Sequence, residues 1–159
     1  MICALVPGAA LADDWEGWAG YSFMRDAKDQ VTFPEGWTAG GARSMTTWLS
    51  VVGDVDGQRK DIPALGGNIV LTSHAVTAGA RAAAKLGPVK QFAQVASGVL
   101  LLHGDAFGSG QTTTTWVIAP GLGLDYSVAK AWAARLQVDV RFVRTGQQVR
   151  AVAALVYRR

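Results

Sequence analysis

In the segment Lys130–Arg144, with the sequence KAWAARLQVDVRFVR, two sets of side chains alternate from one residue to the next, one apolar and the other largely polar. From Trp132 onward the even-numbered residues (one parity) are Trp, Ala, Leu, Val, Val and Phe, and the odd-numbered residues (the other parity) are Ala, Arg, Gln, Asp, Arg and Val. Successive side chains of an extended strand point to opposite faces, whereas a helix would scatter the same charges around its cylinder. The segment is therefore predicted to be a strand with one apolar and one charged face. The fold then depends on which face meets water.

Seven further segments carry strand-like patterns, and no segment gives a convincing helix. The segment HAVTAGARAAAKL is rich in alanine, but its small apolar residues alternate with Thr77, Arg81 and Lys85, and Gly79 would weaken a helix. A chain of 159 residues suffices for one domain with a full core. We predict an all-β domain with eight strands, at Trp15–Arg25, Trp37–Ser44, Trp48–Gly57, His74–Leu86, Val89–His103, Thr113–Ser127, Lys130–Arg144 and Gln148–Arg158.

The connections between these strands differ in length at the two ends. Strands two and three are joined by MTT, four and five by GP, and six and seven by VA. Three of the remaining connections are longer, namely DAKDQVTFPEG, QRKDIPALGGNIVLTS and GDAFGSGQTT, and we expect them to be polar loops. Alternate connections of an up-and-down meander lie at the same end, and outer-membrane barrels combine short periplasmic turns with longer outer loops. The pattern predicts an antiparallel up-and-down transmembrane β-barrel.

Side-chain volume indicates which face points outward. An eight-stranded barrel has an interior just wide enough to be filled by side chains. The apolar parity of strand six carries Trp116, Leu122 and Tyr126 among others, and that of strand seven carries Trp132 and Phe142. This set is too bulky for the interior, whereas the small and charged set would fit. The apolar face is therefore predicted to contact lipid.

Aromatic residues cluster at the predicted strand ends. Trp116 and Tyr126 are ten residues apart on one face, as are Trp132 and Phe142. Ten residues of a strand tilted by about 40° rise about 25 Å, which is the height of the apolar band in such barrels. We predict two aromatic girdles, formed by Trp15, Trp48, Tyr126, Trp132 and Tyr157 at the tight-turn end and by Trp37, Trp116 and Phe142 at the other.

The residues predicted to point into the barrel include many charged side chains. Isolated charges inside a narrow barrel are costly, so they must pair or be hydrated. The predicted lumen network consists of Arg81, Lys85, Asp125, Arg135, Asp139, Arg141 and Arg150, with Asp54 and Asp56 expected to join. A plug of salt bridges explains these residues without a transport role, and a narrow cationic channel is the functional alternative.

Residues 1–12 differ from the rest of the chain. They are apolar and uncharged, they end in Ala10-Leu11-Ala12, and an acidic pair follows at Asp13. This pattern is typical of the cleavage site of a secretory signal peptide, although the basic start is missing. We interpret residues 1–12 as the remnant of a signal peptide and residues 13–159 as one barrel domain, the alternative being an N-terminal tail.

The sequence offers no support for catalysis, a cofactor or a metal site. His103 lies near Asp105 and Ser109, but in a glycine-rich loop with no pattern that fixes a catalytic geometry. Asp54 and Asp56 lack the remaining ligands of a calcium loop. The net charge of +3 comes without a basic run interleaved with aromatic residues, so nucleic acid is not an expected partner.

Three stretches also resemble a known family: GYSFMR in the first strand, GLGLDYSVAKAWAARLQVDVRF across strands six and seven, and the closing AALVYRR. They look like the outer-membrane beta-barrel domain family, related to the small OmpA/OmpX-type barrels. The resemblance implies an eight-stranded barrel of the bacterial outer membrane. Such chains commonly end in an aromatic residue that the barrel-insertion machinery binds, so Tyr157 serves this role here or the terminus has been altered.

These observations favour a monomeric, non-enzymatic barrel of the bacterial outer membrane with a structural or surface-interaction role. Its expected partners are membrane lipid, the barrel-insertion machinery and an unidentified partner of the outer loops. The alternatives are a soluble ligand-binding barrel of lipocalin type, with the faces reversed, a narrow channel, and a lipid-modifying enzyme dependent on His74 or His103.

The first prediction tests the facing. Leu136 and Val138 lie midway between Trp132 and Phe142, so Val138→Arg should cost about 2–4 kcal/mol on a lipid face, whereas Gln137→Arg in the lumen should be tolerated. A soluble barrel would also reject Val138→Arg, so the deciding measurement is a bilayer-restricted quencher acting on a fluorophore at position 138 or 137. Strong quenching at 138 alone is expected; equal or inverted quenching would reverse the facing.

Overall fold

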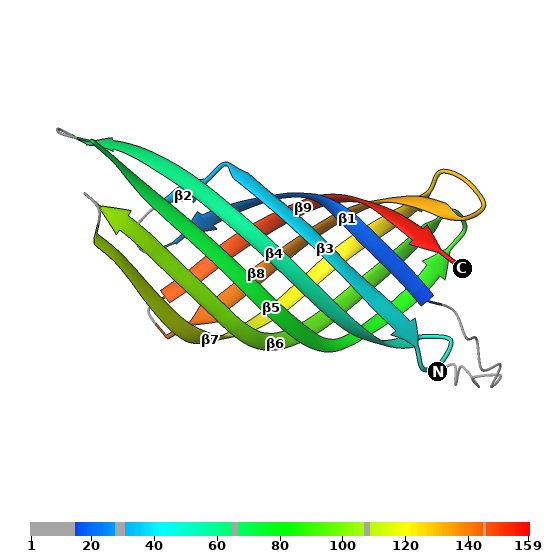
Figure 1. Cartoon of the computed structure of the whole chain (residues 1–159). Helices are drawn as coiled ribbons and strands as arrows, with labels where there is room; N and C mark the ends of the chain where they lie inside the picture. Colours follow the sequence, from blue (N-terminus) through cyan, green and yellow to red (C-terminus); the bar gives the residue numbers. More distant parts are fainter. Residues whose placement is uncertain (1–14, 28–30, 65–66, 107–108, 145) are drawn as a thin grey trace.

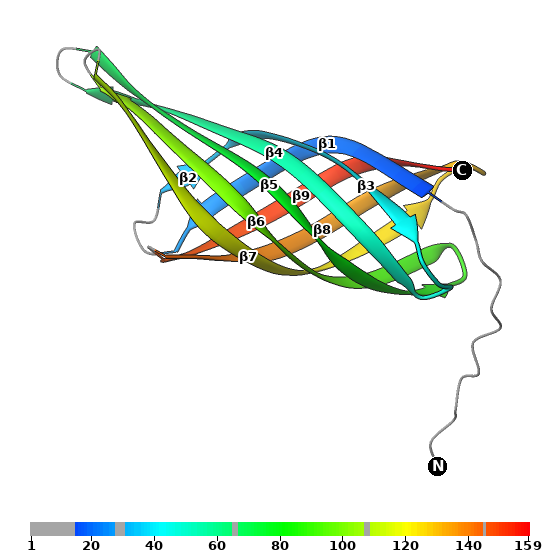
Figure 2. The same ribbon diagram turned by 60° about the horizontal axis from the view of Figure 1, so that its bottom comes forward.

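The computed structural model describes residues 15–27, 31–64, 67–106, 109–144 and 146–159. Long antiparallel strands wrap into a barrel, with the start of the first strand and the end of the last strand at the same end (Figures 1 and 2). The predicted signal remnant, residues 1–12, lies outside the described residues. Among the described residues, no helix is long and apolar enough to cross a membrane.

All eight predicted strands are confirmed, and one short strand is added. Thr32–Phe33 lies within a predicted loop and pairs with the end of the first strand, Met24 opposite Phe33. The strands are β1 Trp15–Asp26, β2 Thr32–Phe33, β3 Glu35–Ser44, β4 Leu49–Ala64, β5 Gly67–Leu86, β6 Val89–Ala106, β7 Ser109–Ser127, β8 Trp132–Val143 and β9 Gly146–Arg158.

Neighbouring strands pair in chain order, and the first and last long strands close the ring. β1 pairs with β3, and the order then continues from β4 to β9. β9 pairs back to β1 from Glu16 opposite Arg158 to Asp26 opposite Gln148. The described residues therefore form a closed eight-stranded antiparallel up-and-down barrel, as predicted from the sequence.

The tight-turn end is built from short local connections. Gly87 and Pro88 join β5 to β6, and Gly87 has a φ of 62°, a conformation that only glycine adopts without strain. A positive φ at the first central residue of a two-residue hairpin loop is the requirement of a type II′ turn. The Gly-Pro dipeptide thus fixes the register of this hairpin.

At the other end, the expectation of two long polar loops was wrong. The segments QRKDIPALGGNIVLTS and GDAFGSGQTT are mostly paired backbone, because β4 and β5 continue to Ala64 opposite Gly67, and β6 and β7 continue to Ala106 opposite Ser109. A continued hairpin satisfies the backbone donors and acceptors that an irregular loop would leave to water. β4 to β7 therefore project beyond the rest of the barrel (Figure 2).

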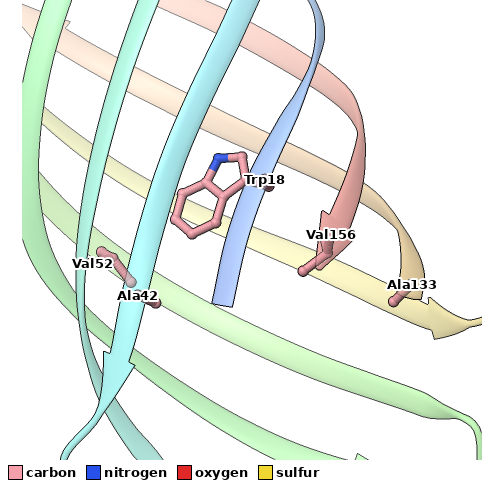
Figure 3. Packing of buried hydrophobic residues seen from close by; sticks show 5 residues of the cluster. All are labelled: Trp18, Ala42, Val52, Ala133 and Val156. Atoms are coloured by element: carbon pink, nitrogen blue, oxygen red, sulfur yellow. The ribbon is translucent and has the colours of Figure 1, made fainter. Parts of the chain in front are cut away.

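The facing agrees with the volume argument. Leu136 and Val138 are 64% and 51% exposed, whereas the alternate side chains of β8 from Ala133 to Arg141 are buried. The interior also holds a small apolar cluster near the tight-turn end, in which Trp18 of β1 lies beside side chains of β3, β4, β8 and β9 (Figure 3). The apolar-inward arrangement of a soluble lipocalin-type barrel is therefore excluded.

Candidate functional site

The barrel interior holds two groups of charged side chains, of which the first lies near the tight-turn end. We call it the turn-end cluster; it comprises Glu16, Arg81, Lys90, Asp125, Arg135 and Arg158. Arg135 lies at its centre: its Nε donates to Asp125 Oδ1 at 2.7 Å and its Nη2 donates to Glu16 Oε1 at 2.7 Å. Glu16 also accepts hydrogen bonds from Arg81 and Lys90. One carboxylate thereby neutralises parts of three cations from three strands.

Two aromatic side chains enclose the arginines of this cluster. The guanidinium carbons of Arg81 and Arg135 lie 4.8 and 4.5 Å from the Trp18 ring centroid, and 4.2 and 4.8 Å from that of Phe92. Cations over aromatic faces gain electrostatic stabilisation, more so when water is excluded. The rings thus stabilise two neighbouring like charges, in addition to the carboxylates.

The second group, which we call the central cluster, comprises Asp54, Asp56, Asp139, Arg141 and Arg150. The Arg150 guanidinium donates to all three carboxylates: Nη1 to Asp54 at 2.8 Å and Asp56 at 2.9 Å, and Nη2 to Asp139 at 2.7 Å. Arg141 binds Asp56 as well. All five side chains are buried, so their mutual pairing replaces the hydration that they lost.

Trp18 links the two clusters. Its indole Nε1 donates to Asp54 Oδ2 at 3.1 Å, while its ring packs against the arginines of the turn-end cluster. Space for the ring comes from Gly40, where an added Cβ would lie 2.4 Å from the indole. Gly123 makes the equivalent space for Phe92, at 2.2 Å. Small inward residues in the sequence therefore leave the space that large side chains occupy in the lumen.

Charge is distributed unevenly along the barrel axis. The turn-end cluster contains four cations and two carboxylates, whereas the central cluster contains two cations and three carboxylates. Beyond the central cluster, a small apolar group of Ala75, Leu100 and Val117 is buried toward the hairpin end. Positive charge therefore increases toward the tight turns.

Six of the seven residues predicted for the lumen network are buried there, namely Arg81, Asp125, Arg135, Asp139, Arg141 and Arg150. Asp54 and Asp56 join them. Lys85 does not: its side chain is exposed, because it lies beside the β5–β6 turn beyond the narrow part of the lumen. Lys90, directly opposite on β6, reaches Glu16 instead.

Sequence reasoning missed Glu16, Lys90 and Arg158, as well as the two lumenal rings. Along β1 the inward parity mixes charged, aromatic, small and apolar residues, so alternation is weak there. The signal that could have found Glu16 is its position in the alternation. Glu16, Trp18 and Ser22 are separated by even numbers of residues and therefore lie on the same, buried face of β1.

The eight predicted girdle residues all have exposed side chains on the outer surface. Tyr157 contacts Trp15 and Trp132, with ring centroids 5.7 and 5.1 Å away, so the three rings form a continuous row at the tight-turn end. At the opposite end Trp37 pairs in register with Tyr21, a further exposed aromatic residue. Their role as membrane girdles stays a prediction.

Neither histidine lies in a catalytic arrangement among the described side chains. His103 is exposed and its Nδ1 lies 2.8 Å from Thr112 Oγ1, while His74 packs beside Gly57 and Trp37 on the outer surface. In the described part of the chain, no three His, Cys, Asp or Glu side chains are grouped to hold a metal ion.

The second prediction concerns the central cluster. Arg150→Met should lower the free energy of unfolding by about 3–5 kcal/mol, because it leaves buried carboxylates without their shared cation. The matched control, Arg25→Met, removes an exposed arginine and should change it by less than about 0.5 kcal/mol. Urea unfolding from lipid vesicles, followed by tryptophan fluorescence, measures both. Equal effects of the two variants would show that the cluster contributes no stability.

No family model matches the chain, and no curated protein matches it. Among solved structures, it is similar to Ail, the attachment invasion locus protein of Yersinia pestis, in complex with the heparin analogue sucrose octasulfate: TM-score 0.72, 15% identity, 92% of this chain and 98% of that chain. It is also similar to Neisserial surface protein A, with a TM-score of 0.68 and 15% identity over 91% of this chain and 94% of that chain. The outer membrane protein OprG of Pseudomonas aeruginosa is similar with a TM-score of 0.70 and 9% identity over 93% of this chain and 96% of that chain.

The likeness covers nearly the whole of each chain, while the sequences are at most 15% identical for these three. It therefore concerns the course of the backbone. This protein has the fold of the small eight-stranded outer-membrane β-barrels, which confirms the fold implied by the sequence resemblance.

Proposed function

We propose that this protein is a monomeric, non-enzymatic barrel of the bacterial outer membrane that acts as a structural or surface-interaction protein. The projecting part of β4 to β7 would present the interaction surface, and the charged clusters would close the lumen. Membrane lipid surrounds the apolar band, and the barrel-insertion machinery assembles the protein. The tight turns face the periplasm and the long hairpins face outward, as in other barrels of this kind.

The observation that carries this proposal is a reversal of side-chain polarity along single continuous strands. On β4 the outward side chains are Val51 and Val55, and then Arg59 and Asp61, all exposed. On β6 the outward Val95 and Leu101 are followed by His103 and Asp105. An outward surface that is apolar over the barrel and polar beyond it fits lipid around the first part and water around the second.

The inward face becomes partly apolar beyond the barrel. Along β4, inward Asp54 and Asp56 are followed by half-buried Lys60 and Ile62, and on β5 inward Arg81 gives way to half-buried Leu71 and Ile69 toward the hairpin tip. The hairpins also pair with each other, up to Val70 opposite Asp105. The projection is thus a four-stranded paired sheet whose inward face mixes apolar residues, such as Leu71, with polar ones, such as Lys60 and Gln111. Such a sheet holds its shape in water better than separate loops would, as a recognition surface requires.

The lumen supports a closed barrel more than a channel. Eight strands leave little open space, and the central cluster fills it with five buried charged side chains paired to one another. An ion crossing this section would have to break these pairs. A structural plug accounts for the inward charges without a transport activity.

The third prediction follows from this. The purified protein in planar bilayers should show no large, steady conductance, because the central cluster blocks the lumen. Replacing Arg141 and Arg150 by serine, which shortens both side chains and unpairs three carboxylates, should raise conductance if the variant inserts. A large steady conductance of the unaltered protein would contradict the plug and favour the narrow channel.

The fourth prediction tests location and orientation. In a Cys3→Ser background, single cysteines are placed at exposed Asp61 on the hairpin extension and at exposed Lys130 on a tight turn. In intact Gram-negative cells expressing the protein, a membrane-impermeant maleimide should label position 61 and leave 130 unlabelled; both should react after lysis.

Fractionation of the same cells should place the protein in the outer membrane, with migration that changes on boiling. Labelling of 130 and protection of 61 would reverse the orientation. Recovery in the soluble fraction, without heat-modifiable migration, would refute a membrane location altogether.

A further inference from the structure

A hollow of about 430 Å³ opens at the tight-turn end of the barrel, beside the start of β1 and the end of β9. Five cationic side chains line it, and Glu16 is the one acidic residue among its lining residues. The cations come from separate parts of the chain: Lys85, Lys90, Lys130, Arg158 and Arg159. Closure of the barrel, which brings β9 beside β1, is what gathers them.

Glu16 neutralises this group only in part, because its single charge is shared among Lys90 and Arg158 of the hollow and Arg81 and Arg135 of the lumen. Its carboxylate accepts from Arg81 and Arg135 on the lumen side, and from Lys90 at 2.9 Å. Arg158 is directed to Asp125, at 2.6 Å from its Nη2, while its Nε lies 3.6 Å from Glu16 Oε2 and forms no hydrogen bond in the described structure. The donors at the base of the hollow therefore exceed the acceptors.

Three further cations line the hollow without an ion pair to any described side chain. Lys85, Lys130 and Arg159 are exposed, and none of these side chains forms an ion pair with any described residue. Lys85 lies directly opposite Lys90 across the β5–β6 hairpin, and like charges in this position are destabilising; Lys90 is paired with Glu16, whereas Lys85 is not. Local backbone bonds hold the group in place, since Arg159 N donates to Trp15 O and Arg158 N donates to Ala131 O.

We infer that this hollow is an anion-binding site for a phosphate group. Lysine binds phosphate as a point charge and arginine binds it through a fork of donors, and the hollow has the size of a small-molecule site. The aromatic row of Trp15, Tyr157 and Trp132, part of the predicted girdle at the membrane interface, lies beside it. The phosphate can therefore come from an anionic lipid headgroup or from a free phosphate compound.

The test compares two variants of the full chain, each lacking three positive charges. The site variant carries Lys85→Gln, Lys130→Gln and Arg159→Gln. The control carries Arg25→Gln, Lys60→Gln and Arg144→Gln, whose side chains lie toward the hairpin end of the barrel. Heat-modifiable migration should be retained in both, because the replaced side chains are not part of the buried clusters.

Two probes are used in uncharged detergent micelles. Native mass spectrometry measures retention of phosphatidylglycerol against phosphatidylcholine, and calorimetry measures binding of inorganic pyrophosphate. The unaltered protein should bind at least one of them, and the site variant should bind it about 100-fold more weakly, whereas the control should lose less than about threefold. Lys130→Gln alone, on an exposed turn, should weaken binding about fivefold.

The outcomes separate the two sources of phosphate. Selective retention of phosphatidylglycerol, displaced by pyrophosphate, identifies the lipid headgroup; pyrophosphate binding without lipid selectivity identifies a free phosphate compound. Absence of binding in the unaltered protein, or an equal loss in the site variant and the control, would overturn the inference. These results do not depend on the hairpin surface or the lumen plug, so they leave the proposed function to its own tests.

Discussion

The pairing of β1 with β9 is the constraint on which the rest of this structure depends. In a bilayer no water satisfies the backbone N–H and C=O groups, so a sheet that crosses it must close on itself. The run from Glu16–Arg158 to Asp26–Gln148 provides this closure. The closure also encloses a lumen too narrow for bulky apolar side chains and brings the two ends of the described chain together. Both the charged interior and the basic hollow follow from the pairing of β1 with β9.

Once the lumen is closed, its contents are set by volume and charge. Glycines such as Gly40 and Gly123 give room to Trp18 and Phe92, and the two rings hold paired arginines against carboxylates. The pairing spans strands that are far apart in sequence: Glu16 and Arg135 are separated by 119 residues. The contacts that cross the lumen, such as Glu16 with Arg135, can form only after the barrel has closed, whereas Asp125 with Arg135 and Asp139 with Arg150 already pair between neighbouring strands.

The two ends of the barrel differ in character. At the tight-turn end, short connections leave cations concentrated around a hollow. At the other end, β4 to β7 continue past the barrel as a paired sheet whose outward face is mostly polar. Both features lie beyond the apolar band, where in the proposed membrane location side chains would meet water and headgroups in place of hydrocarbon. The two proposed interaction sites therefore lie at opposite surfaces of the same barrel.

The sequence by itself determined the eight strands, their order and their facing, because period-two alternation and side-chain volume are local properties. It also placed Arg135, Asp139 and Arg150 in the lumen by parity alone. Only the tertiary structure decided that Lys90 replaces Lys85 in the network, that Glu16 and Trp18 join it, and that the expected loops are paired hairpins. The physical reason is that each of these depends on a neighbour across the barrel or across a hairpin, and parity along one strand carries no information about the partner it will meet.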